Sequence, residues 1–387
     1  MKKHLVILIL SIVLISCLDK KNQDDNKLLG NEVVTFVINQ FPNNHDYNKE
    51  IYISGDFEGW SGGREQFKLK KKNNNYSITI PKYRETINFK FTQGNWETVE
   101  CLENGNPIEN RTYAFTGQDE KVEVNIANWY NLVENNQVST ASKNVHVFAE
   151  DFEIPQLNRK RKVSVYLPPN YETSNKHYPV LYFQDGQNVF DVKTSYTGEW
   201  EVDETLNAMY NEMGFELIVV AIDHGGNKRL NEYSAWDHEK YGKGEGKLYL
   251  DFLVNNLKPE IDKTYRTKPD HNNTGIMGSS LGGLFAHYAA VKRPDVFGQA
   301  GVFSPSFWYA ENGFKFTEEH PNNTKFYYLI GDQEGEEMVN NINRMVELME
   351  LNGFSNIHKK IGPNGIHSES FWKTEFKQAI SWLFINQ

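Results

Sequence analysis

The chain has 387 residues and a formal net charge of −10, with 39% hydrophobic and 24% charged residues. This composition is typical of globular proteins and excludes a disordered chain, while the length predicts two or three domains at about 150 residues each. The acidic balance argues against a nucleic-acid partner, and two cysteines, Cys17 and Cys101, exclude a disulfide framework and a cysteine-based zinc site.

Residues 1–16 have the features of a signal peptide. A short positive segment precedes an apolar run from Leu5 to Ser16. This run is too short for a membrane-spanning helix, which needs about 20 residues, and it suits the apolar core of a signal peptide. It ends in Leu14-Ile15-Ser16-Cys17, which resembles the lipobox of bacterial lipoproteins. We therefore expect a lipid anchor on Cys17 that holds the protein at a membrane of the bacterial cell envelope, facing the periplasm or the cell surface. A plain secretory signal is the alternative.

Residues 17–30 are expected to be a polar tether, and residues 31–130 have the pattern of a small all-β domain. Runs of β-branched and aromatic residues, several of them alternating with polar residues, are separated by clusters of Gly, Asn or Pro. These runs are Val33–Ile38, Ile51–Ile53, Tyr76–Ile80, Ile87–Phe91 and Val122–Ile126. Short strands at this spacing predict a β-sandwich of about 100 residues. The polar residues 131–144 predict a linker.

Strands and helices alternate in residues 145–387. The segments Tyr178–Phe183, Phe215–Ile222 and Phe326–Ile330 are nearly continuous apolar runs, which are typical of buried parallel strands. Apolar residues at helical spacing predict a helix over Glu336–Asn352 and a final amphipathic helix near the C-terminus. This alternation predicts a doubly wound α/β domain.

The stretch Gly278-Ser279-Ser280-Leu281-Gly282 contains the pattern G-x-S-x-G. An apolar strand-like stretch precedes it and a helix-forming run follows, which is the setting of a nucleophile elbow. Such a turn lifts the Ser280 hydroxyl above the sheet, and the glycines on either side avoid crowding. We expect Ser280 to be the nucleophile; the alternative is a Gly-Ser helix start without chemistry. Ser279 is a poorer candidate, because its flanking glycines are out of register.

A serine hydroxyl needs a general base, which in this type of domain follows the nucleophile in the chain. Four histidines follow Ser280. His287 lies inside the predicted helix after the elbow, His320 in a polar loop and His358 in a predicted strand. His367 ends a glycine-flanked loop just before the last helix, so we expect it to be the base. The alternative is a histidine that merely starts a helix.

The acid that orients the base is expected after the strand Phe326–Ile330. The candidates there are Asp332, Glu334, Glu336 and Glu337. We favour Glu334, because glutamate is longer and can reach from one position further along the loop, and Asp332 is the alternative acid. Any one of these carboxylates could instead be a solvated loop residue.

Two backbone N–H groups are expected to stabilise the oxyanion of a tetrahedral intermediate. One belongs to Leu281, directly after the nucleophile. The other should come from the loop after Tyr178–Phe183, where Gly186 permits close approach of the backbone, so Gly186 or Gln187 is the expected donor. An ordinary turn is the alternative. The sequence contains no metal-binding motif, so we expect no metal and no cofactor.

Six motifs in residues 145–387 together resemble the esterase family of α/β-hydrolases that includes enterochelin esterases, feruloyl and acetyl-xylan esterases and S-formylglutathione hydrolases. The motifs are Tyr178–Phe190 (YPVLYFQDGQNVF), Gly198–Trp200 (GEW), Asn231–Ser234 (NEYS), Gly278–Leu284 (GSSLGGL), Phe303–Trp308 (FSPSFW) and Gly365–His367 (GIH). The resemblance implies Ser280 as nucleophile and His367 as base, with the acid in the loop from Gly331 to Glu334.

The β region resembles immunoglobulin-like modules that bind starch and glycogen. The matching segments are Ile53–Trp60 (ISGDFEGW), Phe89–Thr92 (FKFT) and Gly94–Glu97 (GNWE). Trp60 and Trp96 could therefore stack on sugar rings; the alternative is that both are packing residues of the core or rim. Enterochelin esterases also carry an N-terminal sandwich that shapes the active site, so the resemblance is compatible with either role.

We therefore expect a serine carboxylic-ester hydrolase that forms an acyl-enzyme on acylated carbohydrate, with acetyl or feruloyl esters of a polysaccharide as substrate. One alternative is a siderophore trilactone esterase, in which Lys228 and Arg229 would bind the anionic ligand. An alternative of another class is a glycan-binding surface lipoprotein with an inactive hydrolase domain.

Overall fold

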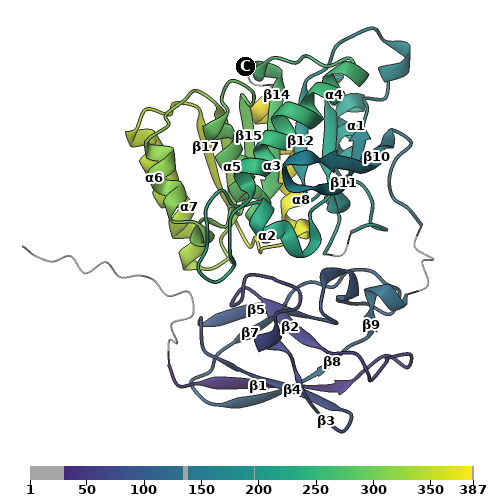
Figure 1. The fold of residues 1–387 in the computed structure, drawn as a ribbon, viewed down its shortest axis with the longest axis vertical. Helices are drawn as coiled ribbons and strands as arrows, with labels where there is room; N and C mark the ends of the chain where they lie inside the picture. The colour runs from purple at the N-terminus through teal and green to yellow at the C-terminus, as the bar shows by residue number, and fades with distance from the viewer. Residues whose placement is uncertain (1–29, 134–137, 196, 386–387) are drawn as a thin grey trace, which may run out of the picture.

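A computed structural model of the chain describes residues 30–133, 138–195 and 197–385 (Figure 1). The predicted signal peptide, Cys17 and most of the predicted tether lie outside the described residues. Within the described ranges, no helix is long and apolar enough to cross a membrane.

The N-terminal region consists of two packed sheets. One sheet has the order β3-β4-β1-β8, and the other has the order β2-β5-β7. Alternate side chains of β1 are buried because successive residues of a strand point to opposite faces. The strands are β1 (Val33–Gln40), β2 (Tyr52–Gly55), β3 (Lys70–Lys72), β4 (Asn75–Pro81), β5 (Thr86–Thr92), β7 (Arg111–Ala114) and β8 (Glu120–Asn125), with the short pair β6 (Glu100–Cys101) and β9 (Asn128–Trp129) beside them.

The C-terminal region contains an eight-stranded sheet of order β10-β11-β13-β12-β14-β15-β16-β17. The strands β12 to β17 are parallel to one another, and β11 and β10 extend the sheet antiparallel. Their bounds are β10 (Val145–Ile154), β11 (Arg159–Tyr166), β12 (Val180–Gln184), β13 (Ile218–Ile222), β14 (Thr274–Ser279), β15 (Gln299–Phe303), β16 (Lys325–Gly331) and β17 (Ile357–Gly362).

Helices cover both faces of this sheet, because the central strands are apolar on both sides. On one face, Val180 and Tyr182 of β12 pack in a core with side chains of α3, α5 and α7. On the other face, Leu181 and Phe183 pack with α1 and α8. The helices are α1 (Val202–Met213), α2 (Arg229–Glu232), α3 (Gly246–Phe252), α4 (Lys258–Thr264), α5 (Leu281–Lys292), α6 (Asn312–Glu318), α7 (Glu336–Leu351) and α8 (Glu369–Phe384). The predicted class, a doubly wound α/β domain after an all-β region, is confirmed.

The β region lies against one end of the α/β region. Its sheet of β2, β5 and β7 faces the α/β region, while β1, β3 and β4 lie on the far side (Figure 1). Arg84 Nη1 pairs with Glu337 Oε2 at 3.1 Å, and the hydroxyl of Tyr241 donates to the backbone carbonyl of Glu58 at 3.0 Å. The β region therefore packs against one end of the α/β region.

Residues 138–144, the described end of the predicted linker, lie along the α/β region. The hydroxyl of Ser139 donates to Asp191 Oδ2 at 2.6 Å, and the hydroxyl of Thr140 donates to Glu199 at 2.9 Å. The backbone N–H of Ser142 donates to Asp203 Oδ2 at 2.7 Å. Polar composition alone predicts a linker, but it does not reveal these carboxylate partners.

Candidate active site

Ser280 sits in a strained turn between β14 and α5. Its φ of 58° and ψ of −123° lie outside the regions that most L-residues adopt. A Cβ atom on Gly278 would lie 2.6 Å from the backbone carbon of Gly282, so these two positions require glycine. The strand ends at Ser279 and the helix begins at Leu281, which leaves the Ser280 side chain above the carboxyl edge of the sheet. This geometry is that of a nucleophile elbow.

His367 lines the same pocket as Ser280, from the loop between β17 and α8. Ser280 Oγ lies 3.3 Å from Ser306 Oγ, and among the described residues it has no hydrogen bond to His367. Hydrogen bonds between nucleophile and base are often long in unliganded enzymes and shorten when substrate binds. Ser280 and His367 therefore line one pocket without a hydrogen bond between them in the described structure, so proton transfer requires one of the two side chains to move.

Glu334 orients the imidazole of His367. The Nδ1 of His367 lies 2.7 Å from Glu334 Oε2, and the Glu334 side chain has no exposed surface. Because a carboxylate only accepts hydrogen bonds, Nδ1 carries the proton and Nε2 keeps its lone pair. Asp332, the alternative acid, is exposed, and its Oδ1 accepts from the side chain of Gln333 at 3.0 Å. The structure thus places Glu334, and not Asp332, against His367.

Two further side chains hold Glu334 in place, and the sequence did not assign them a role. The Ser304 hydroxyl donates to Glu334 Oε1 at 2.6 Å, and Trp372 Nε1 donates to Ser304 Oγ at 2.8 Å. The ring of Trp372 also meets the ring of His367 edge to face, with centroids 4.9 Å apart. Ser304 has a φ of 42°, so it is another non-glycine residue with positive φ at the carboxyl edge of the sheet. Ser304 lies inside the FSPSFW motif, and this motif is the sequence feature that could have indicated its role.

The backbone N–H groups of Leu281 and Gln187 are both available near Ser280. Neither has a hydrogen-bond partner among the described residues, and Gln187 lines the pocket. Gly186 packs instead against β13, since a Cβ there would lie 2.7 Å from the backbone of Ala221 and Ile222. Of the two predicted donors in this loop, the geometry therefore favours Gln187.

The charged groups near the loop of Gly186 and Gln187 are largely paired. Arg229 binds Asp185 through two contacts, Nε to Oδ1 at 2.6 Å and Nη2 to Oδ2 at 2.8 Å. Lys228 is exposed and does not line the pocket. Burial lowers the pKa of His224 to about 4, and its Nδ1 accepts from the backbone N–H of Gly226 at 2.9 Å, so its ring is neutral with the proton on Nε2.

The β region supplies one wall of the pocket through Trp60, Trp96 and Asn110. The two indole rings lie 6.0 Å apart, and Trp96 Nε1 donates to the Trp60 carbonyl at 3.0 Å. The amide of Asn110 donates to the backbone carbonyl of His367 at 3.2 Å. Both tryptophans are half-buried. The cavity at this site has a volume of about 110 Å³.

The loop that carries Trp60 is held by a buried carboxylate. Glu58 has no exposed surface, and its Oε1 accepts from Ser54 Oγ at 2.5 Å, from the Gly55 N–H at 3.2 Å and from the Ser61 N–H at 2.8 Å. Trp60 itself has a φ of 54°. These contacts explain how a short loop can present an indole at a fixed place.

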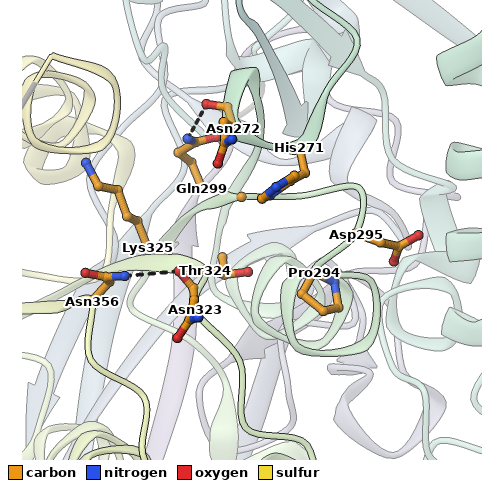
Figure 2. Close-up of a pocket in the computed structure, with 10 residues that line it drawn as sticks. His271, Asn272, Pro294, Asp295, Gln299, Asn323, Thr324, Lys325 and Asn356 are labelled. Atoms are coloured by element: carbon orange, nitrogen blue, oxygen red, sulfur yellow. Dashed lines mark hydrogen bonds between the residues drawn. The ribbon is translucent and has the colours of Figure 1, made fainter. Parts of the chain in front are cut away.

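Two other features lie away from Ser280. A polar hollow of about 720 Å³ is lined by His271, Gln299 and Lys325 at the amino-terminal ends of β14 to β16, the opposite edge of the sheet (Figure 2). Three carboxyl groups that the sequence did not link, those of Glu199, Asp203 and Glu204, lie within 4.8 Å of one another. Of these three, Glu199 and Asp203 accept hydrogen bonds from the segment 138–144.

Comparison with known proteins shows to which family the α/β region belongs. The family described as "Putative esterase" matches residues 154–383. The uncharacterized protein YbbA of Bacillus subtilis (strain 168) is 26% identical over 242 residues, which cover 58% of this chain and 92% of YbbA. An endo-1,4-beta-xylanase/feruloyl esterase of Xylanibacter ruminicola is 26% identical over 231 residues, 58% of this chain but only 30% of that protein.

Solved structures share the fold. The enterobactin esterase FES from Shigella flexneri, with enterobactin present, has a TM-score of 0.52 and 13% identity, and the match covers 92% of this chain and 95% of FES. The BES protein from Bacillus cereus has a TM-score of 0.51 and 19% identity over 65% of this chain and 98% of BES. The likeness to FES thus extends over both regions of the chain.

Proposed function

Because the chain belongs to this esterase family and is a carboxylic ester hydrolase, we propose that it works through an acyl-enzyme formed on Ser280. The observation that carries this mechanism is the Glu334–His367 hydrogen bond of 2.7 Å in the pocket that holds Ser280. A carboxylate on Nδ1 leaves Nε2 free to accept the serine proton.

In the first step, Nε2 of His367 takes the Ser280 proton as Oγ attacks the ester carbonyl carbon. The backbone N–H groups of Leu281 and Gln187 stabilise the oxyanion of the tetrahedral intermediate. Its collapse breaks the bond to the alcohol oxygen, which takes the proton from His367 and leaves as the free alcohol. Water then attacks the acyl-enzyme with His367 again as base, which releases the carboxylic acid and restores Ser280.

We propose acylated carbohydrate as the substrate, with acetyl or feruloyl groups. The half-buried indoles of Trp60 and Trp96 support this substrate, since aromatic rings in a pocket wall offer flat apolar surface with a polar edge. The feruloyl esterase name of the Xylanibacter relative is consistent with it. The Asp185 carboxylate matches the charge of Arg229, which weighs against the highly anionic ligand of the siderophore alternative.

A substrate panel tests this proposal. Wild type and Ser280→Ala are assayed on p-nitrophenyl acetate, acetylated and feruloylated xylo-oligosaccharides, and a catecholate trilactone. We expect wild type to cleave the sugar esters and Ser280→Ala to lose about 10³-fold or more on every ester. Activity on the trilactone with none on any sugar ester would replace the proposed substrate by a siderophore, and equal activity of Ser280→Ala would overturn the mechanism.

We also propose that the mature chain is attached to the cell envelope through Cys17, on the basis of the lipobox-like segment. Two or more acyl chains give stable membrane attachment. Expression of the full chain with an alkyne-labelled fatty acid should label wild type and leave Cys17→Ser unlabelled and in the soluble fraction. A labelled Cys17→Ser variant would contradict the assignment.

A further inference from the structure

Glu369 is a buried carboxylate in the wall of the active-site pocket that the reaction steps do not use. It is the first residue of α8, two positions after His367, and is 9% exposed. It lines the pocket together with Ser280 and His367. Gly198 makes room for it, because a Cβ at Gly198 would lie 3.1 Å from the Glu369 Cβ.

Only one oxygen of Glu369 is engaged. Its Oε1 accepts from Asn188 Nδ2 at 3.1 Å and from Thr197 Oγ1 at 2.9 Å. Among the described residues, Oε2 has no hydrogen-bond partner, and it is not among the polar atoms sealed from solvent. The side chain is thus held in a fixed orientation, and its second oxygen is an accessible acceptor for a donor of a bound molecule.

The charge of Glu369 is also the one in the pocket without a close counter-ion. Arg229 is paired with Asp185, and His367 with Glu334. Lys90 of β5, which is 2% exposed, and Arg229 both interact with Glu369 electrostatically, but no ion pair within 4.0 Å joins either of them to Glu369 in the described part of the chain. Burial raises the pKa of Glu369, and in its ionised form this carboxylate attracts hydrogen-bond donors and repels anions.

The position of Glu369 indicates which part of a substrate it would meet. The leaving alcohol takes its proton from His367, so this alcohol must lie beside the loop that leads into α8. Glu369 follows His367 on the same loop, and Trp60 and Trp96 line the same pocket. A hydroxyl group on the leaving alcohol can therefore donate to Oε2, while the carbon face of that alcohol contacts an indole.

We propose that Glu369 Oε2 binds a hydroxyl group of the leaving alcohol, so that the enzyme selects esters of neutral polyols over esters of apolar or anionic alcohols. This inference rests on the proposed function and names the residue that determines which alcohol the enzyme prefers. Glu369 is a specificity-determining residue and takes no part in proton transfer.

The test compares acetate esters that differ only in the alcohol: glyceryl monoacetate, n-propyl acetate and acetoxyacetate, with an acetylated xylo-oligosaccharide added. For wild type we expect kcat/KM on glyceryl monoacetate to exceed that on propyl acetate by about tenfold or more. Glu369→Gln should bring this ratio close to one, leave propyl acetate within about threefold, and raise the relative rate on acetoxyacetate. Glu347→Gln, on an exposed position of α7, is the matched control for the charge change.

A wild-type ratio near one overturns the inference without any variant, so the test holds even if Glu369→Gln does not fold. An unchanged ratio in Glu369→Gln, or an equal loss on all four esters, also overturns it. A polyol preference without cleavage of the acetylated sugar would instead refute the carbohydrate substrate and keep the role of Glu369.

Discussion

Glu334 is surrounded by donors on both carboxylate oxygens. Its Oε1 accepts from the Gly331 N–H at 2.8 Å and from Ser304 Oγ at 2.6 Å, and its Oε2 faces His367 at 2.7 Å. Three hydrogen bonds fix the carboxylate in one orientation, and the imidazole is aligned by that orientation. In the proposed mechanism, the alignment of His367 therefore depends on residues that do not line the pocket.

Replacement of Glu334 by Gln should reduce kcat by about 10²–10⁴-fold, because an amide can stabilise the wrong tautomer of His367 and cannot balance its positive charge. Asp332→Asn is the matched control and should keep kcat within about twofold, since Asp332 is exposed and contacts Gln333 rather than His367. Steady-state kinetics on p-nitrophenyl acetate measures both. The reverse order of effects would show that Asp332 is the acid.

Ser304→Ala should lower kcat roughly tenfold with little change in KM, because it removes one donor to Glu334 and the acceptor for Trp372 Nε1. Ser304→Thr retains the hydroxyl and would test whether the loss comes from that group. The measurement is the kcat and KM of each variant, with circular dichroism to confirm folding. Unchanged kcat in Ser304→Ala would mean that Glu334 is held sufficiently by Gly331 and His367.

The segment 138–144 donates a hydrogen bond to Glu199, a buried residue just before helix α1 whose carboxyl group resists ionisation. Burial raises the pKa of Glu199 to about 7, above the ordinary value of 4.5. Between pH 4.5 and 7 the folded state thus binds more protons than the unfolded chain. The contribution of Glu199 to stability is present at low pH and is lost as the pH rises through about 7.

Glu199→Gln mimics the protonated carboxyl at every pH, so its Tm relative to wild type should rise between pH 5 and pH 8. We expect a gain of roughly 1–2 °C, because one ionisation shifts the Tm of a chain of this size only slightly. Glu350→Gln, on an exposed position of α7, should show no such trend. Calorimetry at four pH values measures the difference in Tm between Glu199→Gln and wild type. A Tm gain that becomes smaller as the pH rises would contradict the raised pKa of Glu199.

The two regions of the chain meet at the pocket of Ser280, and the contact includes the backbone of His367, the proposed base. Asn110 Nδ2 donates to the His367 carbonyl, whereas Arg84 pairs with Glu337 elsewhere on the interface. We expect Asn110→Ala to lower kcat about threefold to tenfold, because it frees the loop that carries His367. Arg84→Ala breaks a partly buried interface contact that does not involve His367 and should leave kcat unchanged. Equal effects of the two variants would show that Asn110 contributes only to docking.

Sequence patterns predicted the turns, loops and strands whose structure depends on residues close together in the chain. The glycine spacing around Ser280, the loop of His367 and the apolar runs of β12, β13 and β16 are all visible in the sequence. β10 was missed because it is an edge strand with mostly exposed side chains, and β15 because its five residues include a glycine. Glu369 and Asn110 could not be assigned, since their roles come from contacts between segments distant in the chain.

The loop that carries Trp60 bears on how the sequence of this protein can evolve. Its shape is set by Glu58 within the β region, and its indole reaches the pocket without contributing to the chemistry at Ser280. Substitutions at positions 60 and 96 should thus alter one wall of the pocket and leave Ser280, His367 and Glu334 unchanged. A library confined to these two positions offers a compact route to new ester preferences.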